Sequence, residues 1–561
     1  MSGERAVTGP APVLDVTAEA HELVAGLLTE PWGQVSPSVY ETGRLVALSP
    51  GLTGHDQRIG YLLRAQRPDG AWGSPEPGYA LVPTLSATDA LLATLRPGAL
   101  GPVDVAATVG LRVLFRWLRG PAALTRADLP DLPAIELIVP SLVRSINRRL
   151  DAMGDTPPGE GWWPGSERLL CPAGVDGAPL DMISARLAAG GDLPRKLLHA
   201  LEVVPDAARG HRTVRPETTG TVGASPAATA AWLGDPGAAP PGSPARRFLE
   251  EAVRPHDGPV PCGLPVTVFE RGWVLSWLVR AGIDLTPPPE LLDDLVATLG
   301  PAGTAAAAGL PRDADTTAGA LYALALTGRP QPPDSLWEFE LDTHFCTWPG
   351  EDGDSITTNA HVLEAFGQYA RVQRRPEGDT ARRAATIAKV AAWLRERQRA
   401  DGSWHDRWHA SPYYATACAA LALHAFGGPE SAGAVERAVR WTLATQRADG
   451  SWGRWGGTAE ETAYAVQLLL LTRPGAAPVG GAYVILNTGP ANRPEPGLLK
   501  AAERGCDHLM RVPADPDDPA LWHDKDLYRP AAIVRAAMLA ALHLGHRWLG
   551  ARRSDLTGWN A

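Results

Sequence analysis

Three segments of the sequence repeat one pattern, and this pattern limits the folds open to the chain. Each segment passes from a helix-like run through glutamine and an Asp-Gly turn to tryptophan: YLLRAQRPDGAWG (61–73), AWLRERQRADGSWHDRW (392–408) and RWTLATQRADGSWGRW (440–455). Gln398 and Gln446 are 48 residues apart, a spacing that fits one pair of helices per repeat. The repeats therefore predict helical hairpins.

The residues of one repeat indicate how a hairpin closes. Apolar residues within 387–394 recur at intervals of three and four, which predicts a helix with one buried face. Asp401-Gly402 then supplies a turn, because glycine tolerates the positive φ at which a helix stops. Trp404 can fold back onto the helix, and Gln398 can bind backbone groups left unpaired at the end of a neighbouring helix.

The whole chain is predicted to be all-α. Alternating Val/Ile/Thr runs are short, whereas apolar helical windows such as YYATACAALALHAF (413–426) and ETAYAVQLLLLT (461–472) are common. Helical hairpins arranged in a ring form an α/α barrel, whose inner helices enclose an apolar centre. A chain of 561 residues has room for two such barrels.

Composition argues against several classes of function. Lysine and arginine number 52 against 62 acidic residues, and no basic run is present, so we expect no nucleic-acid partner. The five cysteines are far apart without a CxxC pair, which disfavours a disulfide framework or a cysteine-rich zinc site. The N-terminus lacks a signal pattern and no apolar stretch is long enough to span a membrane. We therefore expect a cytoplasmic protein without a transmembrane segment, as a monomer or a homodimer.

The stretch PRDADTTAGALYALALTG (311–328) places two aspartates and two threonines directly before an apolar helix. By itself the stretch has a structural explanation. Asp313 can cap the helix, and Asp315 can be an acid in the first turn that the helix dipole favours. Gly328 and Pro330 then mark the end of the helix.

Together with the repeats, this stretch resembles the class II terpene cyclases, relatives of squalene-hopene cyclase and copalyl diphosphate synthase. Their hallmark is Asp-x-Asp-Asp, and this chain has Asp313-Ala314-Asp315-Thr316-Thr317, a variant that resembles the drimenyl diphosphate synthases. Other segments are similar to family segments and occur in family order: SPSVYETGRLVAL (36–48), YALVPTLSATDALLATL (79–95), AIELIVPSLV (134–143), FERGWVLSWLVRAGI (269–283) and SITTNAHVLEAFG (355–367).

The resemblance implies a domain organisation. The two α/α barrels would be the β and γ domains of this family, with the β domain formed by residues 1–47 and 283–561. The γ domain would be inserted between these parts, as residues 48–282. The active site would lie at the interface of the two domains.

The resemblance also implies an acid. Asp315 would protonate an alkene, Asn359 would orient it, and Thr316 replaces the carboxylate that the family usually has. To be neutral at pH 7, an aspartic acid needs its pKa raised by about three units, or roughly 4 kcal/mol. Burial and the neighbouring Asp313 would raise the pKa of Asp315, whereas the helix N-terminus would lower it.

The implied substrate is a linear prenyl diphosphate that is cyclised with its diphosphate retained. Aromatic faces stabilise carbocations, and the candidates are Phe345, Trp348, Trp273 and Tyr414. Lys525 would bind the diphosphate, and Glu136 matches a family glutamate linked to Mg²⁺. The acidic segment GEDGDS (350–355) could bind Mg²⁺ through oxygen atoms or form a solvated loop.

The predicted substrate length and the predicted class of function each have an alternative. The Thr316 variant favours farnesyl diphosphate and a bicyclic drimenyl product, whereas geranylgeranyl diphosphate would give a copalyl-type product. Asp293-Asp294 lacks the third carboxylate of the motif that ionises diphosphates, so we expect no loss of phosphate. A helical-repeat binding scaffold without chemistry is the alternative of another class. A protein prenyltransferase would need an Asp/Cys/His zinc set, which this sequence does not offer. A glycosidase would need two carboxylates across a polar cleft, and the helices around Asp315 are apolar.

Overall fold

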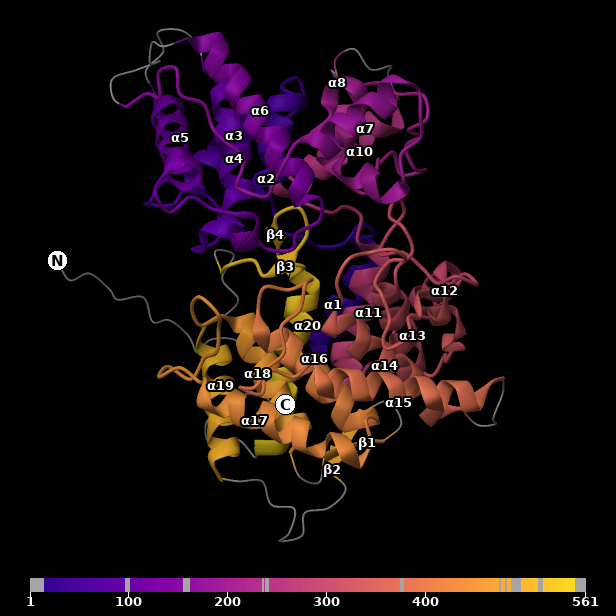
Figure 1. Cartoon of the computed structure of the whole chain (residues 1–561). Helices are drawn as coiled ribbons and strands as arrows, with labels where there is room; N and C mark the ends of the chain where they lie inside the picture. Colours follow the sequence, from indigo (N-terminus) through magenta and orange to yellow (C-terminus); the bar gives the residue numbers. More distant parts are fainter. Residues whose placement is uncertain are drawn as a thin grey trace, which may run out of the picture.

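The computed structural model is mostly helical with few strands, as the sequence predicts (Figure 1). It describes residues 15–95, 101–154, 162–234, 237, 242–373, 378–473, 476–479, 482–485, 496–512 and 518–549. Short strands form two antiparallel pairs: β1 (Ala476–Val479) with β2 (Ala482–Ile485), and β3 (Trp522–His523) with β4 (Leu527–Tyr528).

The C-terminal part of the chain forms a closed ring of inner helices. Each inner helix packs against the next, and the last returns to the first: α11 (Thr267–Arg280), α13 (Ala314–Leu326), α14 (Ile356–Val372), α16 (Pro412–Phe426), α18 (Ala459–Leu471) and α20 (Ala531–Leu549). Outer helices cover this ring: α1 (Val16–Thr29), α12 (Pro289–Thr298), α15 (Thr380–Glu396), α17 (Ala432–Ala444) and α19 (Pro496–Arg511). This arrangement is an α/α barrel.

A second, smaller ring lies above the first in Figure 1. Its inner elements are α2 (Val39–Leu48), α4 (Pro77–Thr94), α6 (Ile135–Met153), the 3-10 helix η2 (Arg195–Val203) and α9 (Pro226–Leu233), which returns to α2. Around them lie α3 (His55–Arg64), α5 (Pro102–Arg119), α7 (Ala178–Ala188), α8 (Pro205–Ala208) and α10 (Pro244–Val253). The remaining 3-10 helices are η1 (Arg126–Asp128), η3 (Arg254–His256), η4 (Pro333–Phe339) and η5 (Pro429–Ser431).

The hydrophobic cores place the domain boundaries differently from the sequence prediction. One core takes in α1 and most of the buried apolar residues from Val266 onward, so α11 packs in the C-terminal barrel, although the predicted inserted domain spans 48–282. The core of the smaller barrel begins at Val39 and includes α2, which the prediction left outside it. Both helices are members of closed rings, and ring membership cannot be read from local periodicity.

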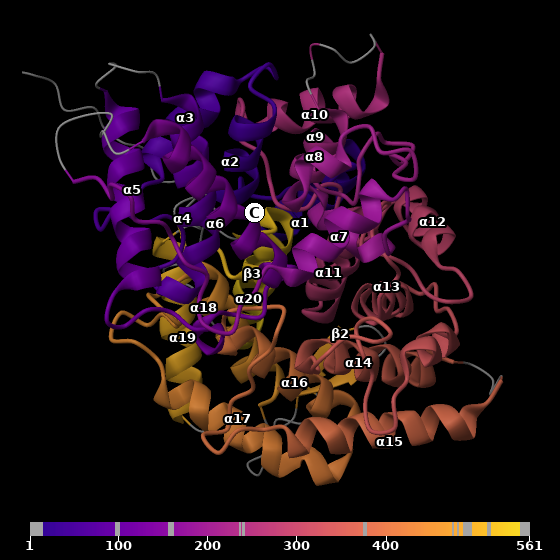
Figure 2. The ribbon, with the colours of Figure 1, turned by 45° about the horizontal axis from the view of Figure 1, so that its top comes forward.

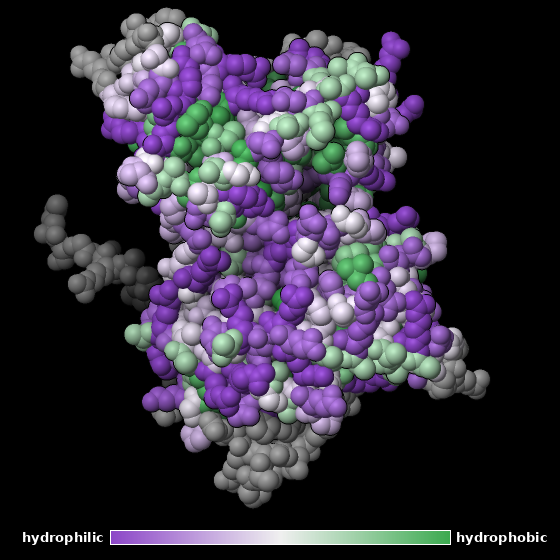
Figure 3. Space-filling view, viewed as in Figure 1, coloured by the Kyte–Doolittle hydropathy of each residue, from purple (hydrophilic) through white to green (hydrophobic). Residues whose placement is uncertain are grey.

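Inner and outer helices differ in how they are buried. Nearly every residue of α13, α16 and α18 is buried, because these helices pack on the barrel centre and on the outer layer at once. The outer helix α17 buries one face only. Figure 3 shows the resulting mostly hydrophilic surface of the C-terminal barrel on one side, and an outline that narrows between the two domains.

The loops that precede inner helices of both barrels meet at the domain junction (Figures 1 and 2). Glu76, at the start of α4, accepts hydrogen bonds from Arg454 and Trp455, which precede α18. Asp131, before α6, pairs with Arg407, before α16, at 2.7 Å. No helix within the described residues is long and apolar enough to cross a membrane.

The repeats close in the predicted manner. Trp72, Trp404 and Trp452 are fully buried, and each indole N–H donates to a carbonyl of the preceding helix at 2.7 or 2.8 Å. Gln398 donates to Gly402 and to the carbonyl of Ala434 in α17, both at 2.9 Å. Gly402 adopts φ +98°, the left-handed conformation that the turn requires. Each repeat is therefore fixed to its own helix and to the next outer helix.

Replacement of Trp404 by alanine should destabilise the C-terminal barrel by about 3–5 kcal/mol, since it removes a fully buried indole. Gln398→Ala should cost less, about 1–3 kcal/mol, because it leaves buried carbonyls without donors. Urea unfolding followed by far-ultraviolet circular dichroism measures the free energy of unfolding of both variants. Equal losses for the two variants would contradict the account of the repeats.

Candidate active site

The Asp313–Asp315 segment starts helix α13 at the barrel end that faces the smaller domain. Asp313 is the N-cap, and its Oδ1 accepts a hydrogen bond from the Thr316 N–H at 2.6 Å. Thr317 donates its hydroxyl to the Asp313 carbonyl at 2.6 Å. Burial raises the pKa of Asp313 to about 8, with a further contribution from the Asp315 charge and an opposing one from the Thr316 N–H. Asp313 is therefore a buried carboxyl group that is neutral at pH 7.

Asp315 is positioned by a histidine that the sequence analysis did not single out. Asp315 Oδ1 lies 2.7 Å from Nδ1 of His361 on α14, and the Asp315 side chain is 18% exposed. Burial would lower the pKa of His361, but the charge and hydrogen bond of Asp315 raise it well above its ordinary value. A protonated His361 therefore donates to Asp315. Asp315 has no arginine partner among the described residues.

Two of the predicted aromatic residues lie beside this pair. The Trp273 ring on α11 meets the His361 ring edge-on with centroids 4.9 Å apart, and its indole N–H donates to the Tyr414 hydroxyl at 2.7 Å. Gly319 on α13 makes room for Trp273, because a Cβ at this position would collide with the indole. A small cavity of about 20 Å³ lies beside His361.

Further aromatic residues that were not predicted pack beside Trp273 and Tyr414, and together they form an aromatic wall. Trp522 on β3 and His409 pack on Tyr414 with centroids 4.7 and 4.5 Å away. Glu460, at the start of α18, accepts hydrogen bonds from the Trp522 indole at 2.8 Å and the Tyr464 hydroxyl at 3.0 Å. Trp522 stands three residues before Lys525 in the segment WHDKDLY. The prediction uses Lys525 from this segment, whereas Trp522 is the residue that packs on Tyr414.

Asn359 does not orient Asp315. Its side-chain N–H groups donate to the carbonyls of Phe345 and Ser355 at 3.0 and 2.8 Å, and its Oδ1 accepts from the Phe345 N–H at 2.9 Å. Both donors of the amide are thus used to hold the loop before α14. Asn359 is a structural residue.

The Phe345 and Trp348 rings make their contacts with residues other than His361. The Phe345 ring packs on Phe366 and lies under the ammonium group of Lys389 on the outer helix α15, 5.2 Å from the ring centroid. Trp348 packs edge-on against Trp408 with centroids 5.1 Å apart. Neither of these ring contacts involves His361, and the prediction that the two rings line the site stays a prediction.

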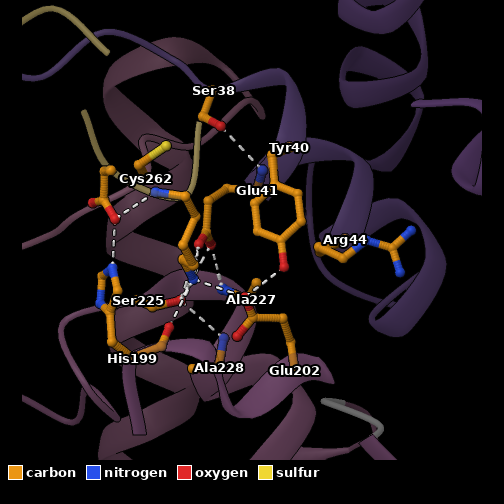
Figure 4. Close-up of polar contacts among 12 residues, drawn as sticks. Ser38, Tyr40, Glu41, Arg44, His199, Glu202, Ser225, Ala227, Ala228 and Cys262 are labelled. Carbon is orange, nitrogen blue, oxygen red and sulfur yellow. Dashed lines mark hydrogen bonds and ion pairs between the residues drawn. The ribbon is translucent and has the colours of Figure 1, made fainter. Parts of the chain in front are cut away.

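Lys525 is buried between the two domains and is not available to a diphosphate. Its ammonium group pairs with Glu41 and with Glu202, the latter at 2.8 Å, and also donates to Ser225 Oγ at 2.8 Å. Figure 4 shows Glu41, Glu202 and Ser225 converging from α2, η2 and the start of α9. We refer to Lys525, Glu41, Glu202 and Ser225 as the Lys525 cluster. The cluster links the β3–β4 turn to the smaller barrel.

The predicted metal ligands do not form a cluster. Glu136 is exposed in the first turn of α6. In the segment 350–355, Glu351 pairs with Arg407 at 3.1 Å and Asp354 with Arg397 at 2.8 Å, so arginines hold these carboxylates. Across the described part of the chain, no group of three or more His, Cys, Asp or Glu side chains could hold a metal ion.

Known proteins resemble this chain over nearly its whole length. The family described as squalene-hopene cyclase C-terminal domain matches residues 351–527. An ent-copalyl diphosphate synthase from a Streptomyces strain is 41% identical over 94% of this chain and 95% of its own length. A labda-7,13-dienyl diphosphate synthase from Streptomyces clavuligerus is 41% identical over 98% of this chain and 97% of its own length.

A solved structure confirms the fold. The ent-copalyl diphosphate synthase from Streptomyces platensis aligns with a TM-score of 0.86 and 45% identity, covering 95% of this chain and all of that one. The all-α, α/α-barrel architecture predicted from the repeats is therefore shared with an enzyme of known structure.

Asp313→Asn should make the stability of the protein less dependent on pH. The folded-state pKa of Asp313 is about 8, above that of the unfolded chain, so its stabilising contribution is full at low pH and is lost as pH rises to 8. Between pH 5 and 8 the stability of the wild type should fall relative to the variant by up to roughly 4 kcal/mol, at about 1.4 kcal/mol per unit. Urea titrations at several pH values test this. The exposed N-cap variant Asp379→Asn should not reproduce the slope.

Lys525→Met should weaken the junction between the domains. It leaves Glu41 and Glu202 buried without their cation, a change that costs about 3–5 kcal/mol. Limited proteolysis and urea unfolding should show earlier separation of the domains than in the exposed-surface control Lys500→Met. A Lys525→Met variant with unchanged stability would show that the Lys525 cluster does not join them.

Proposed function

Since the chain belongs to the class II terpene cyclases, we propose that it cyclises a linear prenyl diphosphate by protonating a carbon–carbon double bond, and leaves the diphosphate in place. The observation that supports this most is the Asp315–His361 hydrogen bond beside the aromatic wall of Trp273, Tyr414 and Trp522.

Asp315 is the proposed proton donor. Its carboxyl proton forms a C–H bond with the terminal double bond, and the pair of electrons left on the carboxylate is stabilised by the protonated His361. The new carbocation is attacked by the next double bond, rings close in turn, and loss of a proton from the last cation gives a neutral product.

The aromatic wall suits a migrating positive charge. Indole and phenol faces attract cations electrostatically, most strongly where water is excluded. Trp273 and Tyr414 are 3% and 1% exposed, so the charge would pass through a dry environment.

The names of the relatives favour a substrate of 20 carbons. Synthases of copalyl and labdadienyl diphosphates are similar to this chain over more than nine-tenths of its length. We therefore propose geranylgeranyl diphosphate as substrate and a copalyl-type bicycle as product. Farnesyl diphosphate is the second candidate, because Thr316 follows Asp315 where the family hallmark has a third aspartate.

We also propose that Mg²⁺ binds together with the diphosphate. Mg²⁺ commonly uses one or two carboxylates, several waters and substrate phosphate oxygens, so it needs no ready-made cluster. Glu136 fits this requirement, since its carboxylate is exposed at the start of α6, where Asp131 already contacts the other domain. There the ion would neutralise diphosphate charge.

Incubation with geranylgeranyl or farnesyl diphosphate, followed by dephosphorylation and mass analysis, tests the proposal. The wild type should give a bicyclic alcohol from geranylgeranyl diphosphate, and Asp315→Asn should lower kcat by at least about 10³-fold while the protein stays folded. His361→Asn should lower kcat by about 10²-fold or more. Turnover of farnesyl diphosphate alone would select the second candidate. Wild-type turnover by Asp315→Asn would exclude Asp315 as the acid.

A further inference from the structure

A buried ion pair lies behind His361, on the side away from the domain junction. Glu364 follows His361 by three residues on α14, so the two side chains share a helix face. Glu364 Oε1 accepts a hydrogen bond from Arg280 on α11 at 2.9 Å, and both side chains are only 5% exposed. The Arg280 guanidinium lies over the Trp277 ring at 4.3 Å.

This ion pair shares a cavity with His361. The small cavity beside His361 is lined by Glu364, Arg280, Cys418 and the indoles of Trp273 and Trp277. Charges in such a dry, aromatic environment are weakly screened, so Glu364 and His361 affect one another strongly. His361 thus stands between Asp315 on α13 and Glu364 on its own helix.

We propose that Glu364 is a positioning residue that keeps His361 protonated, so that His361 can stabilise the Asp315 carboxylate left after proton transfer. This inference rests on the proposed function. Arg280 fixes the Glu364 carboxylate and offsets part of its charge, which leaves Asp315 as the nearer and dominant partner of the imidazolium.

The groups around His361 are consistent with this role. The titratable or charged residues that face it are Asp315 and Tyr322 on α13, Glu364 on α14, Cys418 and Tyr414 on α16, and Arg280 on α11. Burial raises the pKa of Glu364, whereas the charges of Arg280 and His361 lower it. The interaction with His361 is reciprocal, so a Glu364 charge favours the imidazolium.

The test is the pH dependence of kcat in Glu364→Gln, with whichever of the two prenyl diphosphates the wild type converts. Loss of the glutamate charge leaves the positive charge of Arg280 close to His361, which disfavours the protonated form of His361. The limb on which activity falls with rising pH should therefore move to lower pH by about one unit. The double variant Glu364→Gln/Arg280→Met removes both charges and should move the limb in the same direction but less.

Controls separate this role from loss of packing. Asp334→Asn breaks another ion pair of the barrel, with Arg383 at 2.7 Å, and should leave the limb in place. A limb that stays in place or moves to higher pH in Glu364→Gln would overturn the inference. If the wild type gives no product, the proposed function fails, but NMR titration of labelled histidine still tests whether Glu364→Gln lowers the pKa of His361.

Discussion

The hydrogen bond between Asp315 and His361 joins the starts of two inner helices, and the chemistry proposed for the protein depends on it. A carboxyl group can protonate an alkene only if it holds a proton and gives it up readily. Asp313 meets the first condition by burial, but both its environment and its hydrogen bond are those of a helix cap. Asp315, as the proposed acid, must meet both conditions, and the imidazolium of His361 is the group that stabilises the carboxylate left after proton transfer. The two aspartates therefore have separate roles.

The hairpin of β3 and β4 connects this site to the second domain. Its first strand carries Trp522 into the aromatic wall, and its turn carries Lys525 into the smaller barrel. The Lys525 cluster is fully buried, so the turn cannot leave the smaller barrel without exposing several charges that are paired within it. Docking of the domains and the shape of the aromatic wall are thus physically linked.

Local features of the fold were predictable from the sequence, whereas long-range pairings were not. Trp404, Gln398 and Gly402 interact within one repeat, and three copies of the pattern made their roles readable. Lys525 finds its carboxylates on residues that are more than 300 positions away in the chain, and no local pattern indicates this. The resemblance to the family implies Asn359 as the residue that orients the acid, but His361 is the residue that contacts Asp315. Residues two apart on a helix point about 200° apart, and the sequence does not show which face meets α13.

Isotope labelling tests the central claim most directly. In D₂O, protonation by an exchangeable carboxyl group should place one deuterium on the ring carbon that comes from the terminal double bond, with the diphosphate still attached to the product. Mass and NMR analysis of the dephosphorylated product measures this label. A cyclic product without deuterium at that carbon, or one released together with free diphosphate, would contradict the account.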